Sequence, residues 1–239
     1  MKGKIPNTRR GDGRSLKPKR TDISRLRVIF GKMNEHFGPR NWWPGETAFE
    51  ICIGAILTQS VSWRNVAKAI NNLKTAGLLD LQTMHQSPAE EIENCIVPTM
   101  YYRAKTRKLK AFVDHIVQNY NGHLELMLQK DVQTLRKELL NIYGIGPETA
   151  DSIILYAAGK PVFVVDAYTK RIFSRLGFFR EDISYDELQR YFMQTLPPDT
   201  PFFNEFHALI VGVGNRFCSN KKPKCPECPV GELCGFKKK

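Results

Sequence analysis

Apolar residues recur at helical spacing along most of the chain. Ile23, Leu26, Ile29 and Met33 form one stripe on a helix that ends near residues 38–39, where glycine and proline follow. Residues 49–57 are apolar almost all round, which predicts a central buried helix. The same periodicity predicts further helices over residues 62–75, 103–120, 131–142, 147–156, 166–176, 184–195 and 202–215.

Two local signals complete this pattern. Ser87, followed by proline and early acidic residues, is expected to be the N-cap of another helix. Only residues 162–165 resemble a strand, and four residues are more typical of a short lead into the next helix. No internal repeat is evident. The predicted fold class is therefore all-α.

Composition limits the kind of protein and its partners. The 239 residues are enough for one large or two small domains, and 42% of them are hydrophobic. No apolar run is long enough to span a membrane, and the N-terminus has no apolar stretch typical of a signal peptide, so we expect a cytoplasmic protein with no membrane partner. The formal net charge of +12 favours a polyanionic partner.

Part of this charge lies at the N-terminus. Residues 1–20 contain eight lysines and arginines against Asp12 alone, together with glycine and proline. We interpret them as a disordered basic arm, which either adds to the affinity for a polyanion or is a solvated tail. The rest of the chain is also basic, so the net charge is not only a property of this arm.

Four of the six cysteines lie close together near the C-terminus. Cys52 and Cys95 fall in apolar helical patterns and are expected to be packing thiols, whereas the other four are spaced Cys218-x6-Cys225-x2-Cys228-x5-Cys234. Such a group is typical of a metal site in a reducing compartment, and both zinc and a [4Fe–4S] cluster are compatible with four thiolates. Basic side chains in the first loop could contact phosphates: Lys221, Lys222 and Lys224.

A second motif is the glycine pair Gly144-Ile-Gly146 between two predicted helices. Backbone N–H groups of such a hairpin can hold a DNA phosphate without reading base sequence, although most short glycine turns only connect helices. A third is Asp166, which follows an apolar run and by itself is more typical of an ordinary helix cap.

Together, the hairpin, an aspartate 20 residues after its second glycine and the four cysteines resemble the endonuclease III family of DNA glycosylases. The resemblance extends from about residue 25 to residue 234. It implies a [4Fe–4S] cluster rather than zinc, and a six-helix barrel over residues 45–155 beside a second helical part made of residues 21–44 and 156–239. It also implies a partner, double-stranded DNA from which a damaged nucleotide is flipped out, bound by what we expect to be a nucleoid-associated, prokaryotic-type monomer.

The resemblance also suggests roles for individual residues. Asp166 matches the catalytic carboxylate, which stabilises the oxocarbenium-like sugar and orients or activates water. Gln59 matches the glutamine that fills the gap left by the flipped base, and Tyr101 falls where the family places a wedge in the duplex. For both, ordinary packing at a helix end is the alternative.

Glu148 stands where family members with strand-cleaving lyase activity have a lysine. A carboxylate cannot form the Schiff base that β-elimination requires, so the sequence predicts a monofunctional glycosylase. Lys170, one helical turn after Asp166, is the fallback if a lysine does act.

Other motifs resemble the bacterial 3-methyladenine DNA glycosylases of the endonuclease III fold. The residues shared with that group include Trp42-Trp43-Pro44, Leu57-Thr-Gln59, Gly144-Ile-Gly146-x-Glu148 and Val164-Val-Asp166. In that group two aromatic rings enclose the alkylated base, and the matching positions are Trp42 and Trp63; a cationic purine would gain about 0.5–2 kcal/mol of cation–π attraction there.

Three hypotheses remain open at this stage. Two points count against an alkylpurine enzyme. The tryptophans, Trp43 included, could simply be core residues, and the alkylpurine enzymes of this group lack the four cysteines. The favoured hypothesis is an alkylpurine glycosylase. The alternatives are a glycosylase for oxidised or deaminated bases and a non-catalytic DNA-binding protein.

Overall fold

The protein is described by a computed structural model that covers residues 20–236. The arm predicted over residues 1–20 lies outside the described residues, except for Arg20, with which the first helix begins. The described part of the chain contains helices and turns and no strand, which confirms the all-α prediction. None of its helices is both long and apolar enough to cross a membrane.

Twelve α-helices follow one another along residues 20–236. They are α1 (Arg20–Phe37), α2 (Ala48–Leu57), α3 (Trp63–Thr75), α4 (Leu81–Gln86), α5 (Ala89–Ile96), α6 (Tyr102–Tyr120), α7 (Leu124–Leu128), α8 (Val132–Leu140), α9 (Pro147–Ser152), α10 (Ala167–Arg175), α11 (Tyr185–Thr195) and α12 (Thr200–Arg216).

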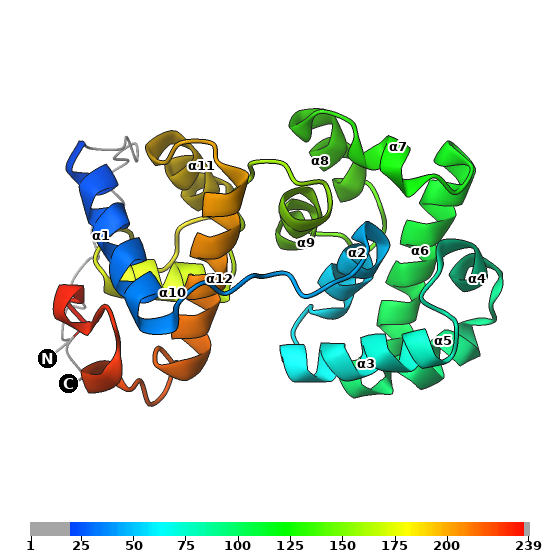
Figure 1. The fold of residues 1–239 in the computed structure, drawn as a ribbon, viewed down its shortest axis with the longest axis horizontal. Coiled ribbons are helices and arrows are strands. Elements are labelled where there is room, and N and C mark those ends of the chain that lie inside the picture. The colour runs from blue at the N-terminus through cyan, green and yellow to red at the C-terminus, as the bar shows by residue number, and fades with distance from the viewer. Residues whose placement is uncertain (1–19, 237–239) are drawn as a thin grey trace, which may run out of the picture.

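These helices form two groups that lie side by side (Figure 1). Helices α2–α9 surround one cluster of buried apolar side chains, which contains Ile53, Phe112 and Ile153. Helices α1 and α10–α12 surround a second cluster, which contains Phe173 and Phe206. Because each group buries its own apolar side chains, each has its own core. We call them the first and second lobes; the exact domain boundaries given above stay a prediction.

Polar caps fix where several helices begin. The Thr47 side chain accepts a hydrogen bond from Glu50 N at the start of α2. Ser184 and Glu187 form a reciprocal capping box at the start of α11, so two backbone donors that no helical carbonyl can reach are satisfied.

The predicted cap at Ser87 is wrong by one residue. Pro88 is the N-cap of α5 and provides no side-chain bond. Ser87 instead ends α4, where its hydroxyl donates to the Thr83 carbonyl at 2.8 Å. A serine between two adjoining helices can bond to the carbonyls behind it as easily as to the N–H groups ahead, and here the former occurs.

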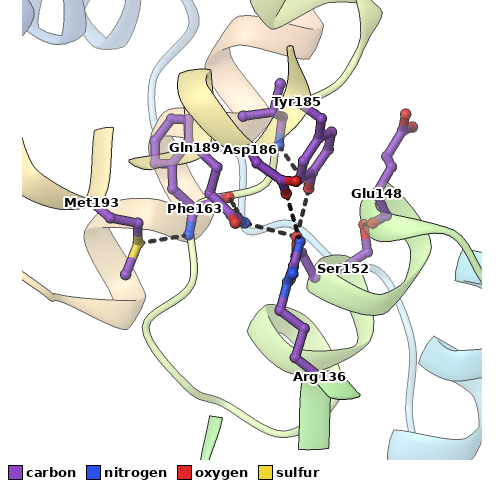
Figure 2. Close-up of polar contacts among 10 residues, drawn as sticks. Arg136, Glu148, Ser152, Phe163, Tyr185, Asp186, Gln189 and Met193 are labelled. Atoms are coloured by element: carbon purple, nitrogen blue, oxygen red, sulfur yellow. Dashed lines mark hydrogen bonds and ion pairs between the residues drawn. The ribbon is translucent and has the colours of Figure 1, made fainter. Parts of the chain in front are cut away.

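One polar cluster joins the two lobes. Asp151 on α9 is 0% exposed and accepts two hydrogen bonds from Arg136 on α8, at 2.8 and 3.2 Å. It also accepts bonds from two side chains of α11, Tyr185 Oη and Gln189 Nε2, each at 2.7 Å. Figure 2 shows the Arg136 side chain extending from α8 toward Tyr185, Asp186 and Gln189 of the second lobe. We call these residues, together with Asp151, the interlobe clasp.

Candidate active site

Asp166 lies at the N-terminus of α10, after a buried apolar segment. Residues 162–165 are all buried, so they fix the position of the Asp166 backbone at the start of the helix. Asp166 is 8% exposed, and its Oδ1 accepts hydrogen bonds from both Thr169 N and Thr169 Oγ1, each at 2.7 Å. Asp166 is therefore a helix cap, as the simpler interpretation held. That role occupies Oδ1 alone and leaves Oδ2 available for chemistry.

The residue that faces Oδ2 is a histidine that the sequence analysis did not single out. His207 Nε2, on α12, lies 3.8 Å from Asp166 Oδ2. The other ring nitrogen, Nδ1, lies 2.6 Å from the hydroxyl of Tyr156. Burial lowers the pKa of His207, and the charge of Asp166 offsets only part of that effect. The contacts of His207 with Tyr156 and Asp166 could not be predicted from sequence spacing, because the three residues come from separate segments.

Glu148 lies in the first turn of α9, and its charge is coupled to that of Asp166. Solvent reaches the residue, yet the pKa of Glu148 is raised to about 7, mainly through partial desolvation by the surrounding protein. The negative charge of Asp166 contributes to this increase, whereas the charge of Lys170 opposes it. In Figure 2 the Glu148 side chain points away from the interlobe clasp. The two carboxylates come from different lobes, and the charge of Asp166 acts on Glu148.

The two positions of the hairpin differ in whether their backbone conformation requires a glycine. Gly144 has φ +82°, a left-handed conformation that favours glycine. Gly146 has no positive φ, and a Cβ there would meet nothing within 4 Å. Since nothing inside the protein requires a glycine at 146, the space that it leaves is open to a ligand outside.

Gln59 links the α2–α3 loop to this hairpin. Its amide Nε2 donates to the Gly144 carbonyl and to Thr149 Oγ1, each at 3.0 Å. Its Oε1 accepts a hydrogen bond from Lys108 Nζ. Both ends of the amide are therefore engaged within the protein, and Gln59 would have to leave these partners to fill a gap in a duplex.

Tyr101 is an exposed aromatic side chain on a strained backbone. It is 72% exposed and has φ +45°, directly after Met100, which has φ +55°. Lys105 holds this loop against the end of α2, since its Nζ donates to the Thr99 carbonyl at 2.7 Å and to the Leu57 carbonyl at 2.9 Å. The two segments expected to enter DNA are thus tied to each other through one buried lysine.

The three tryptophans form one half-buried cluster. The ring centroids of Trp42 and Trp63 are 4.8 Å apart at an interplanar angle of 69°, and those of Trp43 and Trp63 are 5.1 Å apart at 85°. Rings in such edge-to-face contact leave no slot for a base, so the sandwich expected between Trp42 and Trp63 is not formed in this structure. Trp43 also contacts Tyr156, with centroids 5.2 Å apart, which connects the cluster to His207 and Asp166.

The four C-terminal cysteines lie in a loop that packs on the second lobe. Cys218, Cys228 and Cys234 contact its apolar cluster, and Cys228 and Cys225 line a cavity of about 400 Å³. Burial raises the pKa of the Cys228 thiol, and so does the charge of the other three cysteines. Lys221, Lys222 and Lys224 are exposed on the same loop.

This loop does not present a ready site for a single metal ion. Over residues 20–236 no three histidine, cysteine or acidic side chains form a group that could hold one. All six cysteines are free thiols; Cys52 is buried, as expected for a packing residue, whereas Cys95 is only half-buried.

Comparison with known proteins places the chain in a family. Residues 53–198 match the model of the HhH-GPD superfamily of base excision DNA repair proteins. A protein of Methanocaldococcus jannaschii that is named as a DNA repair glycosylase is 46% identical over 208 residues, which cover 86% of this chain and 94% of that protein.

Two solved structures share the fold. An endonuclease III–DNA complex aligns with a TM-score of 0.76 at 26% identity, covering 89% of this chain and 95% of that chain. A 3-methyladenine DNA glycosylase of H. pylori bound to 1,N6-ethenoadenine aligns with a TM-score of 0.66 at 27% identity, covering 80% and 94%.

These matches confirm the predicted resemblance and fold, and they leave the non-catalytic alternative without support. The chain belongs to the HhH-GPD superfamily of base excision DNA repair proteins, and it is a DNA glycosylase.

Proposed function

We propose that this glycosylase is monofunctional and removes alkylated purines, such as 3-methyladenine, from double-stranded DNA. The observation that carries the proposal is Glu148, which lies near Asp166 in the position where strand-cleaving relatives have a lysine. A carboxylate there cannot form a Schiff base with the sugar, so water is the nucleophile that remains. The similarity to the H. pylori 3-methyladenine enzyme supports the choice of substrate.

In this proposal Asp166 acts on the sugar and the tryptophans act on the base. The carboxylate at the start of α10 stabilises positive charge on the sugar as the C1′–N bond breaks. Trp42 and Trp63, with Trp43 behind them, bind the cationic base, which requires their rings to separate from the contact seen here. Gln59, Tyr101 and the hairpin of Gly144 and Gly146 hold the duplex.

The first test separates base release from strand cleavage. Full-length protein is incubated with N-methylpurine DNA, and aliquots are analysed with and without hot alkali. We expect free 3-methyladenine, and nicks only after alkali, because hydrolysis leaves an intact abasic strand. Release of oxidised or deaminated bases alone would favour the second candidate, which the similarity to endonuclease III supports.

A variant with a lysine at position 148 is the positive control for Schiff-base chemistry. Glu148→Lys places an amine near Asp166, and we expect borohydride to trap this variant covalently on DNA while the wild-type protein stays free. Trapping of the wild-type protein would contradict the assignment of Glu148, and Lys170 would then be the first lysine to replace.

We also propose that the four cysteines hold a [4Fe–4S] cluster. The spacing of the four cysteines resembles the cluster loop of the endonuclease III family, and the charges of the other three cysteines contribute to the raised pKa of Cys228. When bound, the cluster would supply a rigid cross-link within the loop. Cys218, Cys225, Cys228 and Cys234 would hold it and fix Lys221, Lys222 and Lys224 on a surface that contacts phosphates.

Metal analysis of the purified protein tests the cluster. We expect about four iron atoms and inorganic sulfide per chain, and their loss in Cys228→Ser together with weaker DNA binding. Cys52→Ser is the matched control, because Cys52 is buried in the first lobe and is expected to leave the iron content unchanged. One zinc per chain, or normal DNA binding by a cluster-free protein, would contradict the proposal.

Three further properties belong to the proposal. The damaged duplex is the partner, the protein acts on chromosomal DNA in the cytoplasm at the nucleoid, and the monomeric state stays a prediction.

A further inference from the structure

His207 is a buried polar side chain with one nitrogen left without a partner. The residue is 6% exposed, and its Nε2 is one of two buried side-chain polar atoms in the described residues that lack a hydrogen bond. A buried polar group without a partner is destabilising, so such an atom calls for an explanation. Nε2 faces the one oxygen of Asp166 that Thr169 does not occupy.

The contact with Tyr156 determines which nitrogen carries the proton. The Tyr156 hydroxyl lies 2.6 Å from His207 Nδ1 and has no other hydrogen-bond partner among residues 20–236. The tyrosine is protonated, because burial raises its pKa well above the usual range. Its buried O–H therefore donates to Nδ1, and the neutral imidazole then carries its proton on Nε2, directed at Asp166.

The distance between Nε2 and Oδ2 suits a bridging molecule. At 3.8 Å the two atoms are too far apart for a direct hydrogen bond, and one water oxygen about 2.8 Å from both would bridge them. Nε2 is closed to solvent in this structure, so the water would enter when the site opens to admit the substrate. Such a water would accept the Nε2 proton with one lone pair and donate one hydrogen to Oδ2. Its second lone pair would remain free to attack a carbon atom.

We propose that His207, oriented by Tyr156, is a positioning residue that holds the hydrolytic water against Asp166 Oδ2. The inference rests on the proposed hydrolytic function. As the water oxygen bonds to C1′, the C1′–N bond breaks and its electron pair leaves with the base, while the water proton passes to Asp166. His207 keeps its own proton throughout and contributes only by fixing the water and its lone pair.

Three variants test this role in the full-length protein. Single-turnover base release is measured on N-methylpurine DNA, and the dissociation constant is measured on DNA that contains an abasic-site analogue. We expect His207→Leu to slow release about 10²-fold with affinity within about twofold, and Tyr156→Phe to slow it about tenfold. His207→Gln should recover most of the rate, since its amide can place an N–H near the position of Nε2.

A matched control separates this role from packing. Tyr191→Phe removes another buried tyrosine hydroxyl in the second lobe and is expected to leave release unchanged. Equal loss in His207→Leu and His207→Gln, or a wild-type rate in His207→Leu, would overturn the proposal, because the N–H would then be irrelevant.

A second measurement does not depend on the substrate. Two-bond ¹H–¹⁵N spectra of histidine-labelled protein report the tautomer of His207, which we expect to carry its proton on Nε2 in the wild-type protein and to populate the other tautomer in Tyr156→Phe. A proton on Nδ1 in the wild-type protein would overturn the proposal even if no variant can be assayed. If instead the wild-type protein releases no methylated purine but shows the expected tautomer, the proposed substrate fails and the geometry stands.

Discussion

Replacing Asp166 with asparagine is expected to slow base release by about 10³-fold while the fold and DNA binding are kept. Asparagine is nearly isosteric, and its oxygen can still accept the two bonds from Thr169 that cap α10. The variant loses the negative charge that stabilises the cationic sugar and the base that receives the proton of water. Without a negative charge beside the phosphates, affinity for DNA should be equal or higher. Single-turnover release and fluorescence anisotropy measure the two effects separately.

The control for this prediction is the same substitution in the same structural role. Asp199 caps α12 in the second lobe, where its Oδ1 accepts a hydrogen bond from Phe202 N at 2.7 Å. Asp199→Asn should therefore report the cost of changing a capping aspartate without touching the site. An unchanged rate in Asp166→Asn would show that the carboxylate assignment is wrong. A loss that matched Asp199→Asn would assign Asp166 a capping role only.

The largest expected effect on stability comes from Asp151. This carboxylate is fully buried and accepts four hydrogen bonds, two from Arg136 and one each from Tyr185 and Gln189. In Asp151→Asn the Arg136 guanidinium loses its buried charged partner, and the NH2 group of the asparagine faces the hydrogen-bond donors of Arg136, Tyr185 or Gln189. Breaking a buried pair in this way costs about 3–5 kcal/mol of the free energy of unfolding. Urea denaturation followed by circular dichroism measures it.

Asp186 provides the comparison within the same cluster. Its carboxylate lies 3.4 Å from the same Arg136, but its side chain is 68% exposed. Solvent screens an exposed pair, so Asp186→Asn should lower the free energy of unfolding by less than about 1 kcal/mol. Equal effects of the two substitutions would mean that burial does not determine the strength of the clasp.

The long helices could be predicted from the sequence, whereas two of the shortest could not. The apolar face of α1 recurs over enough residues to set a period, and α2 is apolar almost all round, which is typical of a buried helix. In contrast, α4 has six residues and α7 has five, which is too short for a periodic pattern, and neither was predicted. Residues 147–156 were expected as one helix, but α9 ends at Ser152 and continues as a wider π-type turn through Ala157.

The residues of the candidate site also differ in how far the sequence could predict them. Asp166 and Glu148 could be found because each belongs to a local motif around the glycine hairpin and the apolar lead into α10. His207 could not, since its significance depends on contacts with Tyr156 and Asp166, which lie 51 and 41 residues away in the sequence. The ring geometry of Trp42 and Trp63 was equally beyond the sequence, because spacing fixes which rings are near but not how they face.

Because the interlobe clasp joins the two lobes, the pKa of Glu148 depends on their relative position. Glu148 belongs to the first lobe and Asp166 to the second, and the charge of Asp166 contributes to the raised pKa of Glu148. Asp151 lies three residues after Glu148 on α9 and is bonded to α11 of the second lobe, so the clasp restrains the distance between the carboxylates of Glu148 and Asp166. A looser clasp would let them move apart, and the pKa of Glu148 would lose the part of its increase that Asp166 contributes, while the part due to desolvation would remain. A lower pKa of Glu148 would therefore indicate a wider separation between its carboxylate and that of Asp166.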